Sequence, residues 1–188
     1  GGIFMKKVIV PLADGAEEME AVIIIDTLRR ASWEVIVAGL KEGPVTASRG
    51  VKIFPDTTID RLNIKDFDMI VLPGGGAGTE NLRKNERVLE IVREFYQKRK
   101  IVAAVCAGPL VLQSAGILKG HKVTCHPAVK DQLTEAERLE EKVVIDRNII
   151  TSQGPGTSFL FALSIIELIE GKEKADSLAG AMIVKRQE

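Results

Sequence analysis

The chain has 188 residues, and its 26 Lys and Arg residues balance its 26 Asp and Glu residues, so its formal net charge is zero. A neutral chain is a poor general binder of nucleic acid, and an aromatic content of 4% leaves few side chains for stacking on bases. A hydrophobic content of 45% is that of a globular protein and excludes disorder over most of the chain.

Short apolar runs alternate with amphipathic segments along the chain. Runs rich in β-branched residues predict buried strands, and apolar residues three or four positions apart predict helices. In chain order the predicted elements are a strand at 7–12, a helix at 18–30, a strand at 34–38, a short antiparallel excursion around Val51 and Ile53, a strand at 68–72, a helix at 85–98, a strand at 101–105, a helix at 109–115, a strand pair at 143–145 and 149–151, and a helix at 157–170 that ends at Gly171. Buried strands separated by helices predict an α/β fold, with a mostly parallel sheet covered by helices on both faces.

The length fits one domain, which we place at residues 5–188. We interpret residues 1–4 as a tag remnant and Met5 as the natural start. The charge-free run at 101–118 is long enough to raise the question of a membrane span. Gly108 and Pro109 interrupt it, so it is better interpreted as a strand, a turn and a helix, and we expect no membrane partner.

Two cysteines, Cys106 and Cys125, cannot form a disulfide scaffold. Together with His121 and His126 they also lack the spacing of a zinc site. The sequence therefore predicts no metal and no cofactor, and free thiols are typical of a reducing, cytoplasmic setting. Cys125 is expected to be the less reactive thiol, and a lone histidine such as His126 more often has a structural role than a catalytic one.

In doubly wound sheets, ligands bind beyond the carboxyl ends of the strands. The segments that follow predicted strands are 13–20, 73–78, 106–109 and 152–158. The last segment opens a helix, which Thr157 or Ser158 is expected to cap.

Cys106 stands where a buried strand turns directly into a helix, between small residues. Such a turn resembles a nucleophile elbow with sulfur in place of a hydroxyl group. The positive end of the helix dipole is expected to lower the pKa of this thiol and to increase its thiolate fraction. The alternative is a buried, inert core cysteine, and the local pattern alone does not choose between the two.

The segments 73–78 and 16–20 carry the other chemical signals. Residues 73–78 hold four glycines, whose accessible amides could bind an anion or an oxyanion, although a simple tight turn explains them equally well. Glu17, Glu18 and Glu20 bring three carboxylates to the end of the first strand. A carboxyl group buried beside a thiol would have a raised pKa and could transfer protons, whereas a preference for the helix N-terminus accounts for two of the three.

These segments together resemble the DJ-1/ThiJ/PfpI superfamily, and within it the DJ-1 branch, from about Lys6 to Lys185. The matching segments are Gly15-Ala16-Glu17-Glu18-Met19-Glu20, Ser48-Arg49-Gly50-Val51, Val71-Leu72-Pro73-Gly74-Gly75, Ala103-Ala104-Val105-Cys106-Ala107-Gly108-Pro109 and Thr151-Ser152-Gln153-Gly154-Pro155-Gly156-Thr157. Each segment alone is a weak signal, but several in one order are highly specific.

The resemblance implies a flavodoxin-like three-layer sandwich, a homodimer and one oxidisable nucleophile per subunit, Cys106. It further implies that Glu20 is a protonated carboxyl group that hydrogen-bonds the sulfur, and that His126 lies beside the pocket. The remaining positions that it implies are backbone amides facing the bound group at Gly75, Gly76 and Ala107, and residues near the pocket or the dimer contact at Arg30, Arg49 and Pro155.

The chain also departs from its superfamily relatives. Protease-like members place a histidine directly after the nucleophile, where this chain has Ala107. Class I glutamine amidotransferases carry Gly in place of Ala104 and need a later histidine, and no histidine follows His126 here. Animal members carry cysteines in place of Ala47 and Phe54 and an arginine in place of Gln153, so the chain looks closer to prokaryotic members.

The resemblance implies an enzyme that acts on reactive carbonyls: a glutathione-independent glyoxalase of the hydratase or lyase type, or a protein deglycase. Cys106 would attack an aldehyde such as methylglyoxal, or a glycated group, and Glu20 would move the proton. The alternative is a non-enzymatic redox sensor, in which oxidation of Cys106 supports a stress-protective or chaperone role. Cysteine peptidase activity is the least favoured interpretation.

Overall fold

The computed structural model describes residues 6–186, so the predicted tag remnant lies outside the described residues. The strands are β1 (Lys7–Leu12), β2 (Glu34–Gly39), β3 (Val45–Thr46), β4 (Lys52–Ile53), β5 (Thr57–Thr58), β6 (Met69–Leu72), β7 (Ile101–Val105), β8 (Lys122–Val123), β9 (Glu137–Arg138), β10 (Val143–Asp146) and β11 (Ile149–Ser152). The α-helices are α1 (Glu18–Arg30), α2 (Gly76–Arg83), α3 (Glu86–Gln97), α4 (Pro109–Ser114), α5 (Ser158–Glu170) and α6 (Lys172–Ala181).

A seven-stranded sheet forms the centre of the protein, in the order β10-β11-β7-β6-β1-β2-β5. Its strands are parallel except for β10, which pairs antiparallel with β11. The run β2-β1-β6-β7-β11 has the flavodoxin-like order. The chain first adds strands on one side of β1 and then, from β6 onward, on the other side, so the strand order reverses between β1 and β6. The predicted fold class is therefore confirmed.

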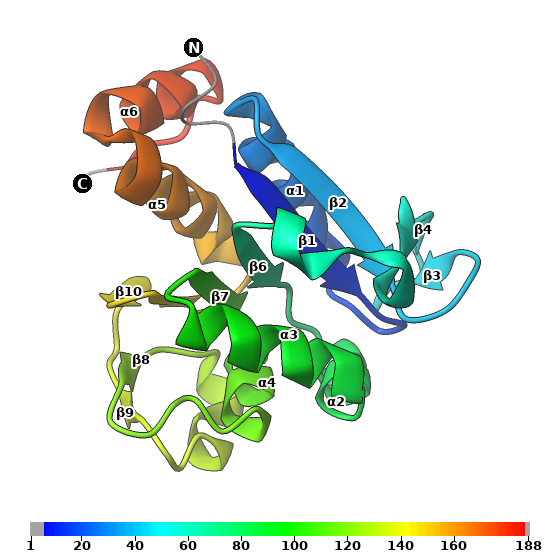
Figure 1. The fold of residues 1–188 in the computed structure, drawn as a ribbon. Coiled ribbons are helices and arrows are strands. Elements are labelled where there is room, and N and C mark those ends of the chain that lie inside the picture. The colour runs from blue at the N-terminus through cyan, green and yellow to red at the C-terminus, as the bar shows by residue number, and fades with distance from the viewer. Residues whose placement is uncertain (1–5, 187–188) are drawn as a thin grey trace.

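Helices cover both faces of the sheet (Figure 1). Successive side chains of a strand point to opposite faces, so Ile9 packs in one core while Val8 and Val10 pack in the other. The first core includes residues of α2, α3 and α4, and the second includes residues of α1, α5 and α6. Because both faces are buried, the central strands carry continuous apolar sequence.

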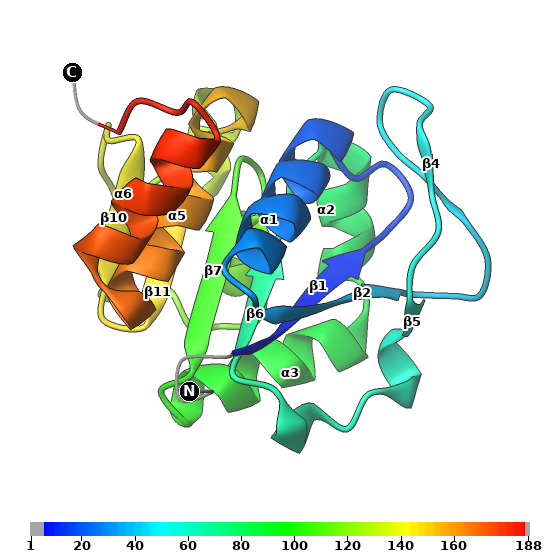
Figure 2. The same cartoon turned by 90° about the horizontal axis from the view of Figure 1, so that it is seen from above.

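The antiparallel excursion is confirmed as the β3–β4 pair, in which Val45 lies opposite Ile53. This short hairpin lies beyond the carboxyl end of β1 (Figures 1 and 2), and the Gly15 N–H donates to the Thr46 carbonyl at 2.9 Å. The pattern did not predict α2, α6, β5 or the parallel pair β8–β9.

None of the helices formed by residues 6–186 is both long and apolar enough to cross a membrane. The apolar run at 101–118 instead forms β7, a turn and α4, as predicted. β1, β6, β7 and β11 are neighbours in the sheet, so the loops at their carboxyl ends meet at one edge.

Candidate active site

Cys106 occupies a strained turn between β7 and α4. Its φ is +64°, in the left-handed region that non-glycine residues rarely adopt. Two backbone hydrogen bonds hold it there: its N–H donates to the Ser152 carbonyl at 3.0 Å, and its carbonyl accepts from the His126 N–H at 2.9 Å. The predicted elbow is therefore present, and its thiol is partly exposed.

Glycines at the end of β6 allow the backbone to approach this thiol. A Cβ atom on Gly74 would lie 2.6 Å from the Cys106 Cβ and 2.7 Å from Glu20 Oε1. Gly75 has φ +93°, and a Cβ there would meet the Glu17 nitrogen at 2.6 Å. The backbone N–H groups of Gly75 and Ala107 both hydrogen-bond the Cys106 sulfur.

Glu20 lies behind the thiol, in the first turn of α1, and is fully buried. Its Oε1 accepts from the Gly74 N–H at 2.9 Å, while Oε2 has no nitrogen or oxygen partner among residues 6–186. Burial raises the pKa of the Glu20 carboxyl from 4.5 to about 7, against the opposing hydrogen bonds from Cys106 and Gly74. The carboxyl therefore exchanges protons near neutral pH, next to the sulfur.

The expectation that the helix dipole lowers the pKa of the Cys106 thiol is wrong. Burial, and then the negative charge of Glu20, raise that pKa from 9.0 to about 12, although the amides of Gly75 and Ala107 act in the opposite direction. α4 has only six residues, and an apolar setting beside a carboxylate disfavours a second negative charge. The thiol keeps its proton while Glu20 is ionised.

A cavity of about 300 Å³ opens above the sulfur. It is lined by Glu17, Ser48, Arg49, Gly75, Gly76, Cys106, Ala107, His126, Ala128, Val129 and Pro155. The structure thus brings seven of the nine predicted site residues to one cavity; Glu20 does not line it but hydrogen-bonds Cys106, which does. Ala128 and Val129 were not predicted, because no chemical signal marks an apolar wall.

His126 enters the cavity at the start of a 3₁₀ turn, Pro127–Gln132. Its Nδ1 accepts from the Ala128 N–H at 3.0 Å, so the neutral ring carries its proton on Nε2. His126 is thus both a structural cap and a side chain of the cavity.

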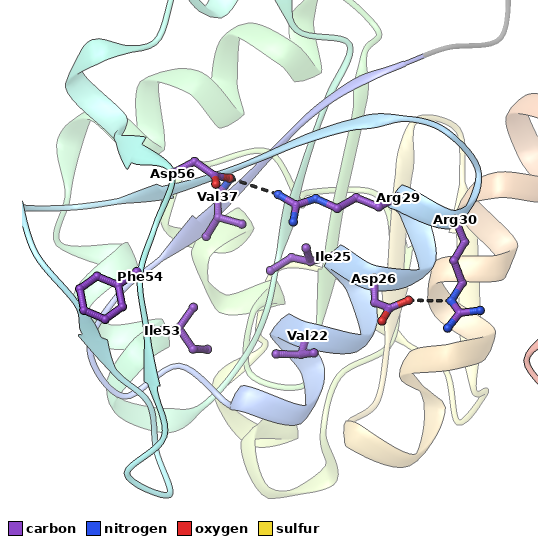
Figure 3. Close-up of a pocket in the computed structure, with 9 residues that line it drawn as sticks. All are labelled: Val22, Ile25, Asp26, Arg29, Arg30, Val37, Ile53, Phe54 and Asp56. Atoms are coloured by element: carbon purple, nitrogen blue, oxygen red, sulfur yellow. Dashed lines mark hydrogen bonds and ion pairs between the residues drawn. The ribbon is translucent and has the colours of Figure 1, made fainter.

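Arg30 does not lie in this cavity. It stands at the end of α1, where its Nε donates to Asp26 Oδ1 at 2.7 Å, beside a separate groove of about 600 Å³ (Figure 3). That groove is larger, but no cysteine or histidine lines it, so its chemistry does not match a nucleophilic site. Its lining residues are Val22, Ile25, Asp26, Arg29, Arg30, Val37, Ile53, Phe54 and Asp56.

The three carboxylates near the start of α1 make different contacts. Glu17 caps the helix, since its carboxylate accepts from the Glu20 N–H at 3.2 Å. Glu18 instead accepts hydrogen bonds from Ser48, Arg49 and Val51, a contact across about thirty residues that sequence spacing could not indicate.

The expected helix cap at the other loop is not formed. Thr157 precedes α5, but its hydroxyl accepts from the N–H groups of Gln153 and Gly154 rather than from the helix. Ser158 donates to the Gly154 carbonyl at 2.9 Å. Within residues 6–186, no three His, Cys, Asp or Glu side chains are grouped so that they could hold a metal ion.

Comparison with known proteins gives consistent matches over most of the chain. The family model described as DJ-1/PfpI matches residues 6–168. The protein named glutathione-independent glyoxalase DJR-1.2 of Caenorhabditis elegans is 40% identical over 167 residues, covering 88% of this chain and 89% of that protein. Protein DJ-1 homolog B of Arabidopsis thaliana is 44% identical over 180 residues, covering 95% of this chain, which spans only 41% of that longer protein.

Solved structures agree with the sequence matches. The crystal structure of Drosophila melanogaster DJ-1beta superposes with a TM-score of 0.93 at 41% identity, covering 96% of this chain and 99% of that one.

Proposed function

The chain belongs to the DJ-1/PfpI family, and we propose that it is a cysteine-dependent enzyme that converts reactive carbonyl compounds without glutathione. One observation carries the proposal: a partly exposed thiol touches a buried carboxyl group whose pKa is about 7, while two backbone amides point at the sulfur. This arrangement combines a nucleophile, an acid–base group and hydrogen-bond donors in one small cavity. The glyoxalase name of the worm relative supports the same class of substrate.

The first step is addition of sulfur to the aldehyde carbon of a 2-oxoaldehyde such as methylglyoxal. Because burial and the charge of Glu20 keep the thiol protonated, the Glu20 carboxylate takes the thiol proton as the C–S bond forms. Glu20 then passes this proton to the carbonyl oxygen, which becomes the hydroxyl group of a hemithioacetal, and Glu20 is a carboxylate again. The amides of Gly75 and Ala107 stabilise the negative charge that develops on that oxygen.

The second step is an internal redox exchange within the substrate. Glu20 removes the hydrogen of the former aldehyde carbon as a proton while the ketone oxygen takes up a proton, which gives an enediol. Glu20 then returns its proton to the former ketone carbon as the hydroxyl group on the former aldehyde carbon loses its proton, so the proton lost by one oxygen balances the proton gained by the other. The aldehyde carbon is thereby oxidised to a thioester and the ketone carbon reduced to an alcohol, so no external oxidant or reductant is needed. Water then hydrolyses the thioester, which releases lactate and restores the thiol.

His126 is proposed to hold the substrate by donating its Nε2–H to a carbonyl oxygen. Release of a sugar adduct from a glycated group would begin with the same attack by Cys106, so deglycase activity is an extension of this chemistry. A reduced thiol is required throughout, which fits a reducing compartment such as the cytoplasm.

The test follows the product by proton NMR during incubation of the purified protein with methylglyoxal. We expect lactate signals that increase steadily after the initial loss of aldehyde. If the only new signals are those of a hemithioacetal that disappears on dilution, the proposed function is wrong.

A redox sensor is the second candidate, and the two amides at the sulfur favour it too. Peroxide would convert the thiol to sulfenic acid and water, and a second equivalent would give sulfinic acid. The amides of Gly75 and Ala107 could then stabilise the anion, and a stress-protective or chaperone role would follow from oxidation. No observation favours a peptidase, since Ala107 occupies the position of the histidine in protease-like relatives.

We also propose that the protein is a homodimer. Four large apolar side chains are exposed on α1 and around it: Met19 at 56%, Val22 at 49%, Phe54 at 76% and Phe159 at 39%. Val22 also lines two adjoining grooves, one toward the β3–β4 hairpin and one toward α5 and α6. An apolar surface of this kind on both sides of one helix fits a self-complementary contact.

A further inference from the structure

Glu18 is a buried carboxylate that takes no part in the proposed reaction. It is the first residue of α1 and is only 8% exposed. Its side chain does not point toward the thiol but toward the turn at residues 47–51, between β3 and β4. The helix dipole already favours an acidic residue in the first turn, so these contacts with the β3–β4 turn are additional to it.

The Glu18 carboxylate accepts hydrogen bonds from three groups of that turn. Oε1 accepts from the Ser48 hydroxyl at 2.9 Å and the Arg49 N–H at 3.0 Å, and Oε2 accepts from the Arg49 N–H at 2.9 Å and the Val51 N–H at 3.3 Å. Burial acts to raise the pKa of Glu18, but these donors and its own N–H outweigh burial and lower that pKa to about 2. The carboxylate is therefore ionised at every pH at which the protein would work.

Besides Glu18, two hydrogen bonds tie Thr46, the residue before the turn, to the segment after β1: the Gly15 N–H donates to the Thr46 carbonyl at 2.9 Å, and the Thr46 N–H donates to Asp14 Oδ1 at 3.0 Å. β3 and β4 contain two residues each, and a two-stranded hairpin of that size is marginal by itself. Three backbone bonds support it: Ala47 N–H to Val51 O at 2.9 Å, Gly50 N–H to Ala47 O at 3.0 Å, and Ser48 N–H to Ala16 O at 2.8 Å. Of these three bonds within residues 47–51, only the last joins the turn to the segment that leads into α1.

The same turn supplies one wall of the thiol cavity, through Ser48 and Arg49. We infer that Glu18 is a positioning residue for this site: its carboxylate fixes the turn at residues 48–51, so that Ser48 and Arg49 close the cavity above Cys106. The effect expected on KM rests on the proposed function, whereas the effects expected on the shape of the cavity and on the mobility of the turn do not. The two neighbouring carboxylates then have different roles: Glu20 acts on the reacting sulfur, and Glu18 acts indirectly, by holding Ser48 and Arg49 in the cavity wall.

The experiment compares Glu18→Ala and Glu18→Gln with the matched control Glu86→Gln, which removes the charge from the same first position of α3, away from the cavity. In Glu18→Ala we expect KM for methylglyoxal to rise about tenfold with kcat within about twofold of wild type, as expected when a binding wall is lost. Glu18→Gln keeps one acceptor oxygen and should recover part of this loss. Glu86→Gln should behave like wild type.

Two further measurements do not require turnover. The first is the alkylation ratio, the rate at which a bulky maleimide alkylates Cys106 divided by the rate for the small reagent iodoacetamide. This ratio should be about fivefold higher in Glu18→Ala than in wild type, because the opened wall admits the larger reagent. Trypsin should cut the intact protein after Arg49 at least about tenfold faster, because the turn loses its anchor.

The inference is overturned if KM, the alkylation ratio and the cleavage rate of Glu18→Ala all stay within about twofold of wild type. It is also overturned if kcat falls while KM does not, or if Glu86→Gln shows the same changes. A wild-type protein without turnover would contradict the proposed function alone, since alkylation and proteolysis would still decide the role of Glu18.

Discussion

The Glu20 carboxyl and the Cys106 thiol share a hydrogen bond inside the protein, and burial raises the pKa of both groups, to about 7 and about 12. Two neighbouring acids in an apolar setting cannot easily both be ionised, so near neutral pH the pair carries at most one negative charge. In the proposed reaction the thiol would therefore be activated at the moment of attack rather than beforehand. This distinguishes the site from one that relies on a preformed thiolate at a helix N-terminus.

Replacing Glu20 by glutamine should change stability in a pH-dependent way. The pKa of Glu20 is raised in the folded protein, so the folded state gains stability from it below about pH 4.5 and loses that stability as the pH rises through about 7. Glu20→Gln removes the ionisable group. The free energy of unfolding of the variant, relative to that of wild type, should therefore be about 2 to 3 kcal/mol higher at pH 8 than at pH 5. Urea unfolding at both pH values measures this.

Glu173→Gln is the control for that experiment, because Glu173 is exposed on α6 and its replacement should have the same small effect at both pH values. If the stability difference between Glu20→Gln and wild type is the same at pH 5 and pH 8, the raised pKa is not a property of the protein.

Activity should follow the ionisation of Glu20. As a general base Glu20 must be deprotonated, so kcat/KM for methylglyoxal should rise with pH and level off above an inflection near 7. In Glu20→Gln that inflection should vanish, and turnover should fall by about a hundredfold or more. A wild-type profile that is flat between pH 5 and pH 8 would remove Glu20 from the mechanism.

Gly74 should be essential for the geometry of the site. A Cβ on Gly74 would lie 2.6 Å from the Cys106 Cβ and 2.7 Å from Glu20 Oε1, so Gly74→Ala forces both groups to move. We expect a loss of about 1 to 3 kcal/mol in the free energy of unfolding, together with loss of turnover.

The matched control is Gly180→Ala, because an added Cβ in this part of α6 meets nothing within 4 Å. It should stabilise the helix by about 0.5 to 1 kcal/mol. Equal stability of the two variants would contradict the close approach of Gly74 to the site.

Much of the fold follows from the sequence, for reasons that also explain what was missed. β1, β6 and β7 are buried on both faces, so their continuous apolar runs identify them. α2 begins with Gly76-Ala77-Gly78 and has no helical periodicity at its start; its position depends on tertiary contacts such as Leu82 in the core. α6 buries only Ala175 and Ala179, too few for an amphipathic signal.

The sequence indicated which residues lie together around the thiol, but not how burial and neighbouring charges shift their pKa values. The order of the family segments indicated Cys106, Glu20 and the amides of Gly75 and Ala107. The pKa of Cys106 was predicted in the wrong direction because it depends on burial and on the distance to Glu20, which a linear pattern does not contain. Arg30 was predicted to lie near the pocket or a dimer contact; it lies outside the thiol cavity and lines the groove beside α1.

The dimer proposal predicts that a charge on α1 dissociates the protein. Val22→Asp places a carboxylate amid the exposed apolar side chains, so the variant should sediment as a monomer at micromolar concentration while wild type sediments as a dimer. The control is Ile145→Asp, which changes a similarly exposed aliphatic residue, 48% against 49%, on the edge strand β10. A monomeric wild type, or dissociation by both substitutions, would contradict the proposed contact.

The measurement that bears most strongly on the proposed activity is a count of the lactate released per protein molecule from methylglyoxal, in wild type, Cys106→Ser and Cys125→Ala. Cys125 is fully buried, so its replacement should leave turnover intact, while Cys106→Ser should abolish it. We expect many lactate molecules per Cys106 thiol in wild type. One equivalent or less, or undiminished release by Cys106→Ser, would show that the protein is not a cysteine-dependent carbonyl enzyme.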